Sequence, residues 1–183
     1  MSNNTDYYYK CLSKRNYQNG NYSLETVQPE HIEKIRKWRN EQLEVLRQSK
    51  LISKEQQIKY YRNFIWSEMK NKFPDNIILS FKDVDSLIGY GGLVYIEWEN
   101  SVAESSFLLA TELTKDKRLY KQNFFAFFKL LKLVTFDELK LKKLVSETYI
   151  HRKNHIRLLE DIGFEKLDIQ KKIYSISHKL EYH

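Results

Sequence analysis

Cysteine is almost absent from the sequence, and this excludes two kinds of stabilising site. Cys11 is the single cysteine among 183 residues. One thiol can form neither an internal disulfide nor a cysteine-based metal site. No apolar run is long enough to cross a membrane, and segment 1–15 has no apolar signal core. We therefore expect a cytoplasmic protein from a reducing environment, with no membrane partner.

Motifs of several enzyme classes are missing as well. The chain has neither a G-x-S-x-G nucleophile elbow nor a Walker phosphate loop. His151 and His155 are four residues apart, but no set of carboxylates or cysteines stands beside them. We therefore expect no metal site.

What is present is the composition of a folded domain. Hydrophobic residues make up 42% and charged residues 30%, a balance that argues against a disordered chain. The 13 tyrosines, 10 phenylalanines and 3 tryptophans can bury a sizeable core. A length of 183 residues fits a single domain.

The net charge of +7 has two readings. It is either a lysine-rich solvated surface or a field that attracts a polyanion. No nucleic-acid-binding module and no long basic run is present, so we expect no nucleic-acid partner. A phosphorylated small molecule, such as coenzyme A or a nucleotide sugar, would use the same field.

Hydrophobic periodicity predicts an α/β (α+β) domain over residues 22–183, preceded by a loosely attached polar extension over residues 1–21. Helix signals are Pro29, the capping-box pair Ser53 and Gln56, and the stop at Gly163. Three consecutive strands joined by short turns indicate an antiparallel meander rather than a doubly wound sheet. The predicted strands are 22–28, 76–82, 87–98, 102–110, 143–150 and 173–177, and the predicted helices are 29–42, one from Ser53, 119–139 and 154–162.

Four segments in this order resemble the GNAT family of N-acetyltransferases, over roughly residues 22–178. They are residues 35–40 (IRKWRN), 87–93 (LIGYGGL), 103–109 (AESSFLL) and 154–164 (Asn154 to Gly163-Phe164). The branch that the chain looks most like includes ribosomal-protein and amino-sugar (pseudaminic-type pathway) acetyltransferases. The resemblance implies a mixed, mostly antiparallel sheet of six or seven strands with about four helices. It also implies a splay between the family's fourth and fifth strands, which here means between the strand near Ala110 and the strand that begins near Lys143.

The resemblance implies acetyl-CoA as co-substrate and names residues to hold it. Backbone groups after the splay would pair with the pantetheine arm, and Asn154 would hold it from the other side; an ordinary helix N-cap is the alternative role for Asn154. The family usually has a glycine-rich R/Q-x-x-G-x-G/A loop before the long helix, but residues 119–124 contain no glycine. The helix N-terminus, helped by Lys117, is expected to bind the pyrophosphate instead. The expected coenzyme residues are Leu108, Leu109, Ala110, Arg118, Lys121, Gln122, Asn123, Phe124, Asn154 and Arg157.

Glu104 is the expected catalytic base, because it stands in an otherwise apolar strand, where burial would raise its pKa. A structural ion pair is its alternative role. Many relatives place a tyrosine near the thiol as general acid, and the matching residue here is Leu159. Tyr120, Tyr149 and His155 are the substitutes that the sequence offers.

The WRN segment and the glycine-containing strand are expected to bind the acceptor. Arg39 suits a phosphate or carboxylate, because its planar fork binds two oxygens, whereas core packing is the favoured alternative role for Trp38. The expected acceptor residues are Trp38, Arg39, Asn40, Gln48, Tyr90 and Gly91. We expect transfer to the amino group of a nucleotide-linked amino sugar. A protein N-terminus, a polyamine or a non-catalytic acyl-CoA-binding module remains open, and so does a homodimer.

Overall fold

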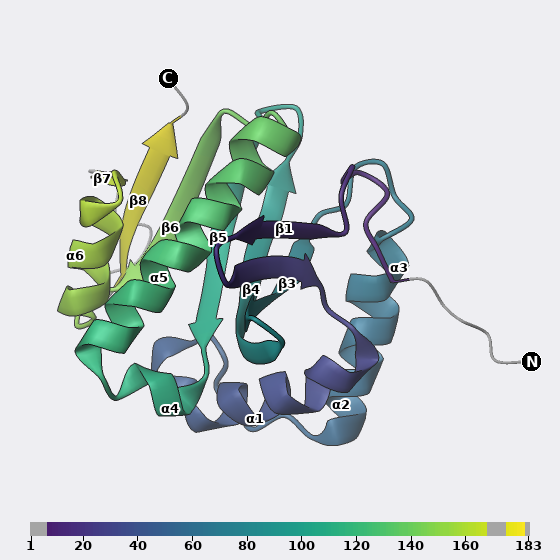
Figure 1. The fold of residues 1–183 in the computed structure, drawn as a ribbon, viewed down its shortest axis with the longest axis horizontal. Coiled ribbons are helices and arrows are strands. Elements are labelled where there is room, and N and C mark those ends of the chain that lie inside the picture. Colours follow the sequence, from purple (N-terminus) through teal and green to yellow (C-terminus); the bar gives the residue numbers. More distant parts are fainter. Residues whose placement is uncertain (1–6, 168–174, 182–183) are drawn as a thin grey trace, which may run out of the picture.

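The computed structural model describes residues 7–167 and 175–181, which form one eight-stranded sheet (Figure 1). The strand order across the sheet is β1-β2-β3-β4-β5-β6-β8-β7. Neighbouring strands are antiparallel except β5 and β6, which are parallel. The strands are β1 (Asn16–Asn19), β2 (Tyr22–Thr26), β3 (Ile77–Asp83), β4 (Ser86–Glu97), β5 (Val102–Leu109), β6 (Lys143–Tyr149), β7 (Glu165–Lys166) and β8 (Ser175–Glu181).

The mixed, mostly antiparallel sheet and its central meander β3-β4-β5 are as predicted. The strand count is higher than the expected six or seven, because β1 and β7 are too short and too polar for period-two alternation to reveal them. The final strand was expected at residues 173–177; β8 begins at Ser175, and residues 173 and 174 lie outside the described residues.

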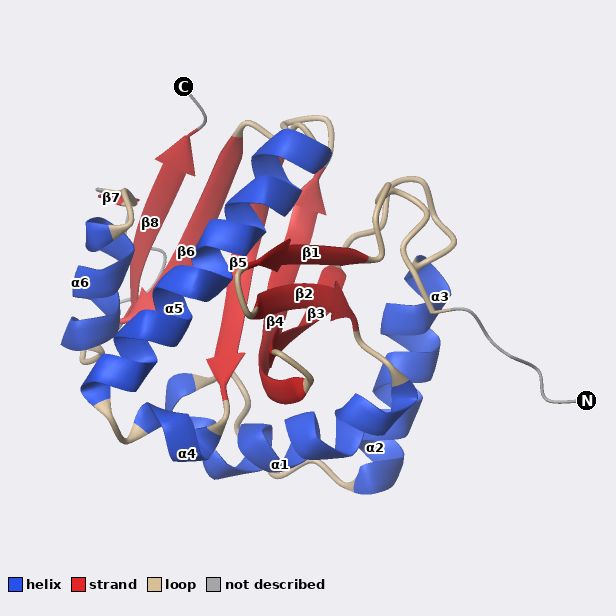
Figure 2. Cartoon of the chain, viewed as in Figure 1, coloured by secondary structure: helices blue, strands red, loops and turns tan. Residues whose placement is uncertain are grey.

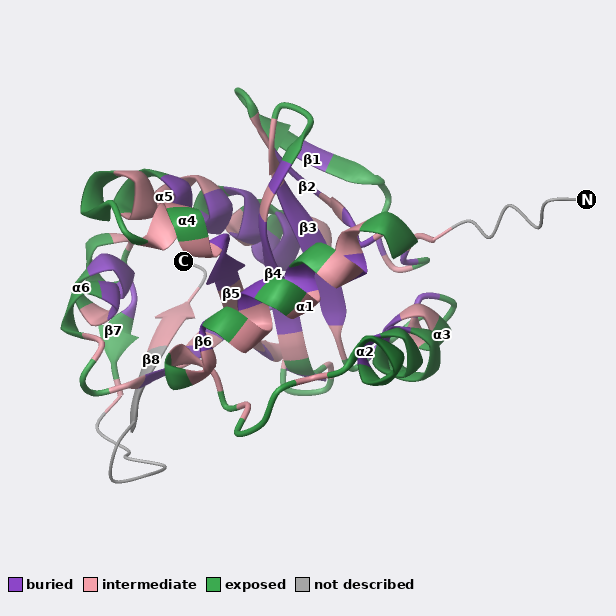
Figure 3. Cartoon of the chain, turned by 90° about the horizontal axis from the view of Figure 1, so that it is seen from below, coloured by how far each residue is buried: buried purple, intermediate pink, exposed green. Residues whose placement is uncertain are grey.

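The helices lie around the sheet (Figure 2). Seen from below, α5 runs along one side of the strands and α2 and α3 lie on the other (Figure 3). The helical turn η1 (Pro29–His31) leads into α1 (Ile32–Glu41), and η2 (Leu43–Val45) follows. The other helical segments are α2 (Lys54–Tyr60), η3 (Tyr61–Ile65), α3 (Trp66–Glu68), α4 (Thr111–Thr114), α5 (Lys117–Lys132), η4 (Leu133–Glu138) and α6 (Lys153–Asp161).

The predicted helix boundaries rest on caps that the structure contains. Pro29 opens η1, and Ser53 with Gln56 forms the expected capping box at the start of α2. Gly163 ends α6 with a φ of 101°, a conformation that suits glycine because it has no Cβ. No helix of the described segments is long and apolar enough to cross a membrane.

The N-terminal segment is not loosely attached where the structure describes it. Tyr9 is 1% exposed, and its hydroxyl accepts a hydrogen bond from the Ile78 amide at 2.9 Å. Residues 16–19 pair with β2 along their whole length. The tyrosines of this segment look polar in sequence, but their rings bury as an apolar body would.

Candidate functional site

The site lies where β5 and β6 part. The two strands pair only at Val102–Lys143, Ala103–Leu144 and Glu104–Val145. Beyond Glu104, β5 continues to Leu109 and β6 to Tyr149 with no pairing between them. The predicted splay is therefore confirmed.

Two cavities open at this splay, and they meet. One is about 600 Å³ and lies between the end of β5, α4–α5 and the start of α6. The other is about 510 Å³ and lies between β4, β5, β6 and the segment after η2. Both are of the size of small-molecule sites. We call them the α6 cavity and the β6 cavity; the residues that line both are Val45, Phe107, Arg152 and His155.

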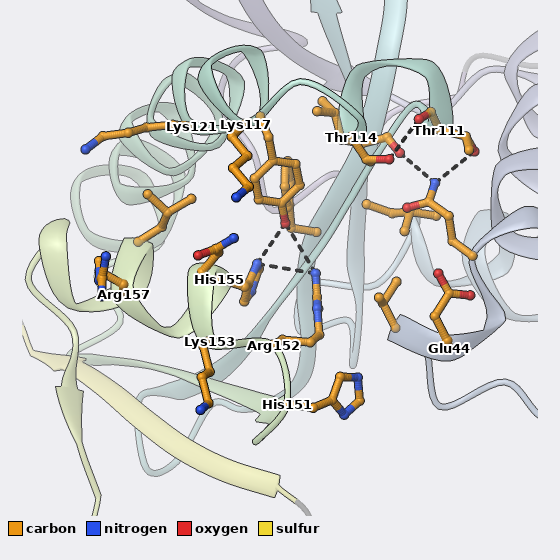
Figure 4. A pocket seen from close by; sticks show the side chains of 18 of the residues that line it. Glu44, Thr111, Thr114, Lys117, Lys121, His151, Arg152, Lys153, His155 and Arg157 are labelled. Carbon is orange, nitrogen blue, oxygen red and sulfur yellow. Dashed lines mark hydrogen bonds between the residues drawn. The ribbon is translucent and has the colours of Figure 1, made fainter.

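A tyrosine, a histidine and an arginine converge at this junction. The Tyr120 hydroxyl on α5 lies 2.8 Å from Nδ1 of His155 on α6. Arg152 donates to the same hydroxyl at 3.3 Å (Figure 4). Burial raises the pKa of Tyr120, and the nearby Arg152 opposes that shift only partly. Tyr120 is therefore a protonated phenol at neutral pH, able to donate a proton.

Of the three substitutes for the missing family tyrosine, the structure brings two together. Tyr120 and His155 line the α6 cavity, and His155 also lines the β6 cavity. Tyr149 lines the β6 cavity and donates its hydroxyl to the Leu46 carbonyl at 3.3 Å. Leu159 is fully buried in the core, so nothing at that position could reach a ligand without repacking.

Two carboxylates face the β6 cavity where the pairing of β5 and β6 ends, Glu104 in the last paired rung and Glu147 two residues beyond it. Glu104 on β5 and Glu147 on β6 are bridged by the guanidinium of Arg47, which lies 3.1 Å from Glu147 and closer still to Glu104. Each glutamate side chain is 13% exposed. Glu104 therefore forms the ion pair that was its alternative role, and it also lines a cavity; its role as catalytic base stays a prediction.

The three residues of the WRN segment have separate roles. Trp38 is buried core and lines neither cavity. Asn40 fixes the following segment, because its side chain bonds Gln48 and both backbone groups of Ile52. Only Arg39 lines the β6 cavity, so the structure does not bring the whole motif to the acceptor cleft.

Arg39 is held by neutral groups. It donates from Nε to Gln48 at 2.9 Å and from Nη1 to the Tyr90 hydroxyl at 3.1 Å. Among the described residues, no carboxylate pairs with it. A largely buried guanidinium without a counter-charge favours an anionic ligand. Gln48 and Tyr90 line the same cavity, as expected for acceptor residues.

Close packing, and not contact with a ligand cavity, explains the glycine at position 91. A Cβ there would lie 2.1 Å from the Ser106 carbonyl oxygen and 2.8 Å from the Phe127 ring. The glycine therefore lets β4 approach β5 and α5, and Gly91 lines neither cavity. The pairing of β4 with β5 is interrupted by a bulge at Val94–Glu97, where Tyr95 has a φ of 50°.

The expected coenzyme residues divide into two groups. Those that line the α6 cavity are Leu108, Leu109, Lys121, Asn154 and Arg157. Asn154 is not an N-cap, since Arg152 holds that position on α6. The backbone pairing expected for the end of β5 is partly taken. The Leu109 carbonyl accepts from Gln42, and the Ala110 amide donates to the Ile88 carbonyl.

The other group does not reach the cavity. Phe124 is fully buried core, Asn123 bonds the Leu119 carbonyl, and Gln122 bonds the Tyr22 hydroxyl. Arg118 and Ala110 also lie outside the cavity lining. Residues 122–124 lie more than one turn into α5, so their side chains point away from a ligand at the start of the helix. The family motif by itself does not show this orientation.

The N-terminus of α5 is already capped. Asp116 accepts from the amides of Arg118 at 2.7 Å and Leu119 at 3.1 Å. These hydrogen bonds lower the pKa of Asp116, which is therefore an anion where the family places a phosphate. The expectation of free helix amides is wrong. The cations lining the α6 cavity are instead the side chains Lys117, Lys121, Arg152, Lys153 and Arg157.

Sequence reasoning missed Arg47, Glu147 and Asp116. Glu147 had a detectable signal, because it is a charged residue within a β-branched strand, as Glu104 is in its own strand. Asp116 has the spacing of an N-cap. Arg47 stands in a segment without periodicity, and no pattern there predicts it. In residues 7–167 and 175–181, no three histidine, cysteine or acidic side chains are grouped to hold a metal ion.

Comparisons with known proteins agree with this geometry. The family described as "Acetyltransferase (GNAT) domain" matches residues 24–180. No curated protein matches the sequence. A spermidine N-acetyltransferase from Vibrio cholerae, solved with CoA and spermine, is 16% identical, with a TM-score of 0.67 over 88% of this chain and 94% of that chain. Its dodecameric form is 15% identical, with a TM-score of 0.62 over 89% and 95%. At these identities the likeness shows the fold.

Proposed function

Because the chain belongs to the GNAT family of acetyltransferases and is an acyltransferase, we propose that it transfers an acetyl group from acetyl-CoA to the primary amine of a nucleotide-linked amino sugar. The observation that carries the acceptor class is the charge of the β6 cavity. Arg39, Arg47 and Arg152 line it against Glu104 and Glu147, and Arg39 has no acidic partner among the described residues. An amine that also carries phosphate matches both kinds of charge in the cavity, because its ammonium suits the glutamates and its phosphate suits the arginines.

The coenzyme fits the α6 cavity. The strand edge of β5 beyond Glu104 is unpaired toward β6, which suits an extended arm that carries amide groups. Lysine and arginine side chains at the far end suit a pyrophosphate. Acetyl-CoA supplies an activated thioester, and the junction of the two cavities would bring it to the acceptor.

Residues of the chain would then transfer two protons, one taken from the ammonium group of the acceptor and one given to the departing sulfur. An alkyl ammonium has a pKa of roughly 10, so it must lose a proton before it can act as a nucleophile. Glu104 and Glu147 are the carboxylates of the β6 cavity that can accept this proton, directly or through water. At the junction, the Tyr120 hydroxyl is placed to donate a proton to the departing sulfur, and His155 Nδ1 orients that hydroxyl.

The tyrosines of the β6 cavity support an acceptor larger than an amine chain. Tyr60, Tyr90 and Tyr95 line it together with Arg39. Aromatic faces and a planar guanidinium suit a sugar or base ring and a phosphate. A linear polycation, by contrast, would enter a cavity with three arginines and two glutamates, so its extra charges would be repelled.

A polyamine acceptor is the second candidate. The glutamate pair favours it, and the similar Vibrio cholerae structure carries spermine. A non-catalytic acyl-CoA-binding module would bind the coenzyme without turnover. A protein N-terminus as acceptor needs an open groove beside the site.

A panel of amines separates these candidates. We expect release of free thiol from acetyl-CoA with amino sugars, with a lower KM for glucosamine 1-phosphate than for glucosamine. Arg39→Gln should raise the KM of the phosphorylated sugar and leave that of glucosamine nearly unchanged. A strong preference for spermidine would reverse the proposed order, and coenzyme binding without turnover on any amine would support the binding module.

A further inference from the structure

We infer that the acceptor's ammonium group binds between Glu104 and Glu147 by displacing the guanidinium of Arg47. Arg47 is thus a resident cation that keeps the amine subsite filled until a charged amine arrives. This inference rests on the proposed function, because it places the amine of that reaction. It adds a subsite and a selectivity device that neither the family match nor the neighbouring structures describe.

The space between Glu104 and Glu147 suits any cation of the right size, not only the guanidinium of Arg47. Glu104 and Glu147 come from adjacent strands at the point where pairing ends, and both side chains are largely buried. Two carboxylates that share a poorly solvated site need a positive charge between them. One nitrogen of Arg47, Nη2, contacts both of them. An ammonium nitrogen presents the same charge with three donors.

The position also lies on the path of the reaction. Arg47, Glu104 and Glu147 line the β6 cavity, which joins the α6 cavity at Phe107 and His155. A cation held by the two carboxylates therefore stands on the acceptor side of that junction. An amine bound there would have the base beside it before it meets the thioester.

The Arg47 side chain is more exposed to solvent than the two glutamates that it bridges. Its side chain is 41% exposed, against 13% for each glutamate. Its two neighbours in the chain are held: the Leu46 carbonyl accepts from Tyr149, and the Gln48 side chain accepts from Arg39 and donates to Asn40. Displacement is therefore a rotation of one side chain toward solvent, without opening of the segment.

The arrangement discriminates between nucleophiles. A hydroxyl or a water molecule carries no charge and cannot replace a guanidinium on two carboxylates. An ammonium group can, because it restores the same ion pairs. Arg47 should accordingly exclude neutral nucleophiles and limit hydrolysis of the thioester in the absence of an amine.

The test follows the Arg47 Nε–Hε resonance by NMR in protein labelled with 15N-arginine, with Arg47→Gln used for assignment. We expect glucosamine 1-phosphate to move this resonance saturably toward the position of free arginine. In the Glu104→Gln/Glu147→Gln protein it should lie there without ligand. If that variant does not fold, the single variant Glu147→Gln serves, with a partial shift expected.

Kinetics provide the second readout. Arg47→Gln should lower the acceptor KM about fivefold, the equivalent of an ion pair of about 1 kcal/mol, and raise thioester hydrolysis without an amine. Arg47→Lys keeps the resident charge and should do neither.

The possible results separate the two proposals. A resonance that stays in place while transfer saturates overturns this inference and leaves the proposed function standing. A resonance that moves without any transfer supports the subsite and overturns the enzymatic proposal. A higher KM in Arg47→Gln would make Arg47 an acceptor-binding residue, which also overturns the inference.

Discussion

The hydroxyl of Tyr120 and Nδ1 of His155 lie 2.8 Å apart, although the two residues belong to different helices and are 35 positions apart in the chain. Their contact sits at the junction of the two cavities. The tyrosine that many relatives place near the thiol matches Leu159 on α6, whereas here the candidate phenol comes from α5 and α6 supplies its partner.

Removing this hydroxyl should slow transfer. We expect Tyr120→Phe to lower kcat by about ten- to a hundredfold, at the low end of general-acid effects because a thiolate leaves readily, and to leave the coenzyme Kd within about twofold. Steady-state kinetics and calorimetry measure the two quantities. Tyr22→Phe is the matched control, because its hydroxyl bonds Gln122 away from both cavities. Equal kcat values in the two variants would remove Tyr120 from the mechanism.

The pKa of Tyr120 predicts the alkaline side of the pH profile. Burial raises this pKa above the ordinary tyrosine value of about 10, so the phenol keeps its proton throughout the neutral range. As pH rises from 6, kcat should increase while the amine loses its proton, with no alkaline decline below the ordinary tyrosine pKa of about 10. A decline with a midpoint near 8 would show that another group donates the proton.

Asp116 should weaken coenzyme binding through its charge. We expect Asp116→Asn, which keeps a capping oxygen, to lower the Kd of coenzyme A severalfold at low salt, since it removes an anion from a site for pyrophosphate. The gain should disappear at high salt, where such interactions are screened. Asp116→Ala also loses the cap and should lower the Tm. Unchanged affinity in Asp116→Asn would place the pyrophosphate away from the start of α5.

Gly91 should prove structural. An added methyl group meets the Ser106 carbonyl oxygen and the Phe127 ring, so Gly91→Ala should destabilise the fold by about 1–3 kcal/mol. Thermal unfolding would show this as a lower Tm, and Ser86→Ala on the exposed end of the same strand is the control. A normal Tm with a raised acceptor KM would return Gly91 to the acceptor site.

The protonation of His31, which lies outside both cavities, should make the stability of the fold depend on pH. Burial lowers the pKa of His31, whose Nδ1 accepts from the Gln28 amide at 3.2 Å and lies 2.7 Å from the Ser80 hydroxyl. Because the unfolded chain binds the proton more readily, stability should fall as pH drops below about 6.5. His31→Asn should flatten this dependence in urea titrations between pH 7 and 5. An equal slope in both proteins would assign the acid sensitivity to other groups.

The sequence by itself determined the element order, the helix caps and the class of fold. Pro29, the Ser53–Gln56 box and Gly163 act through neighbouring backbone groups, so their effect is local and readable from spacing. The four family segments also located the splay, because their order specifies which strands meet there. Two of the four segments contain Arg39 and Asn154, and the structure has each of these residues in the lining of a cavity at the splay.

Only the tertiary structure decided which side chains share a cavity and which of them neutralise one another. Arg47 meets Glu104 and Glu147 across separations of 57 and 100 residues, and Tyr120 meets His155 across two helices. Helix rotation turned Phe124 into the core. Charge pairing and burial depend on distances in space that chain spacing does not encode, and so the contact of Arg47 with Glu104 and Glu147 was invisible in the sequence.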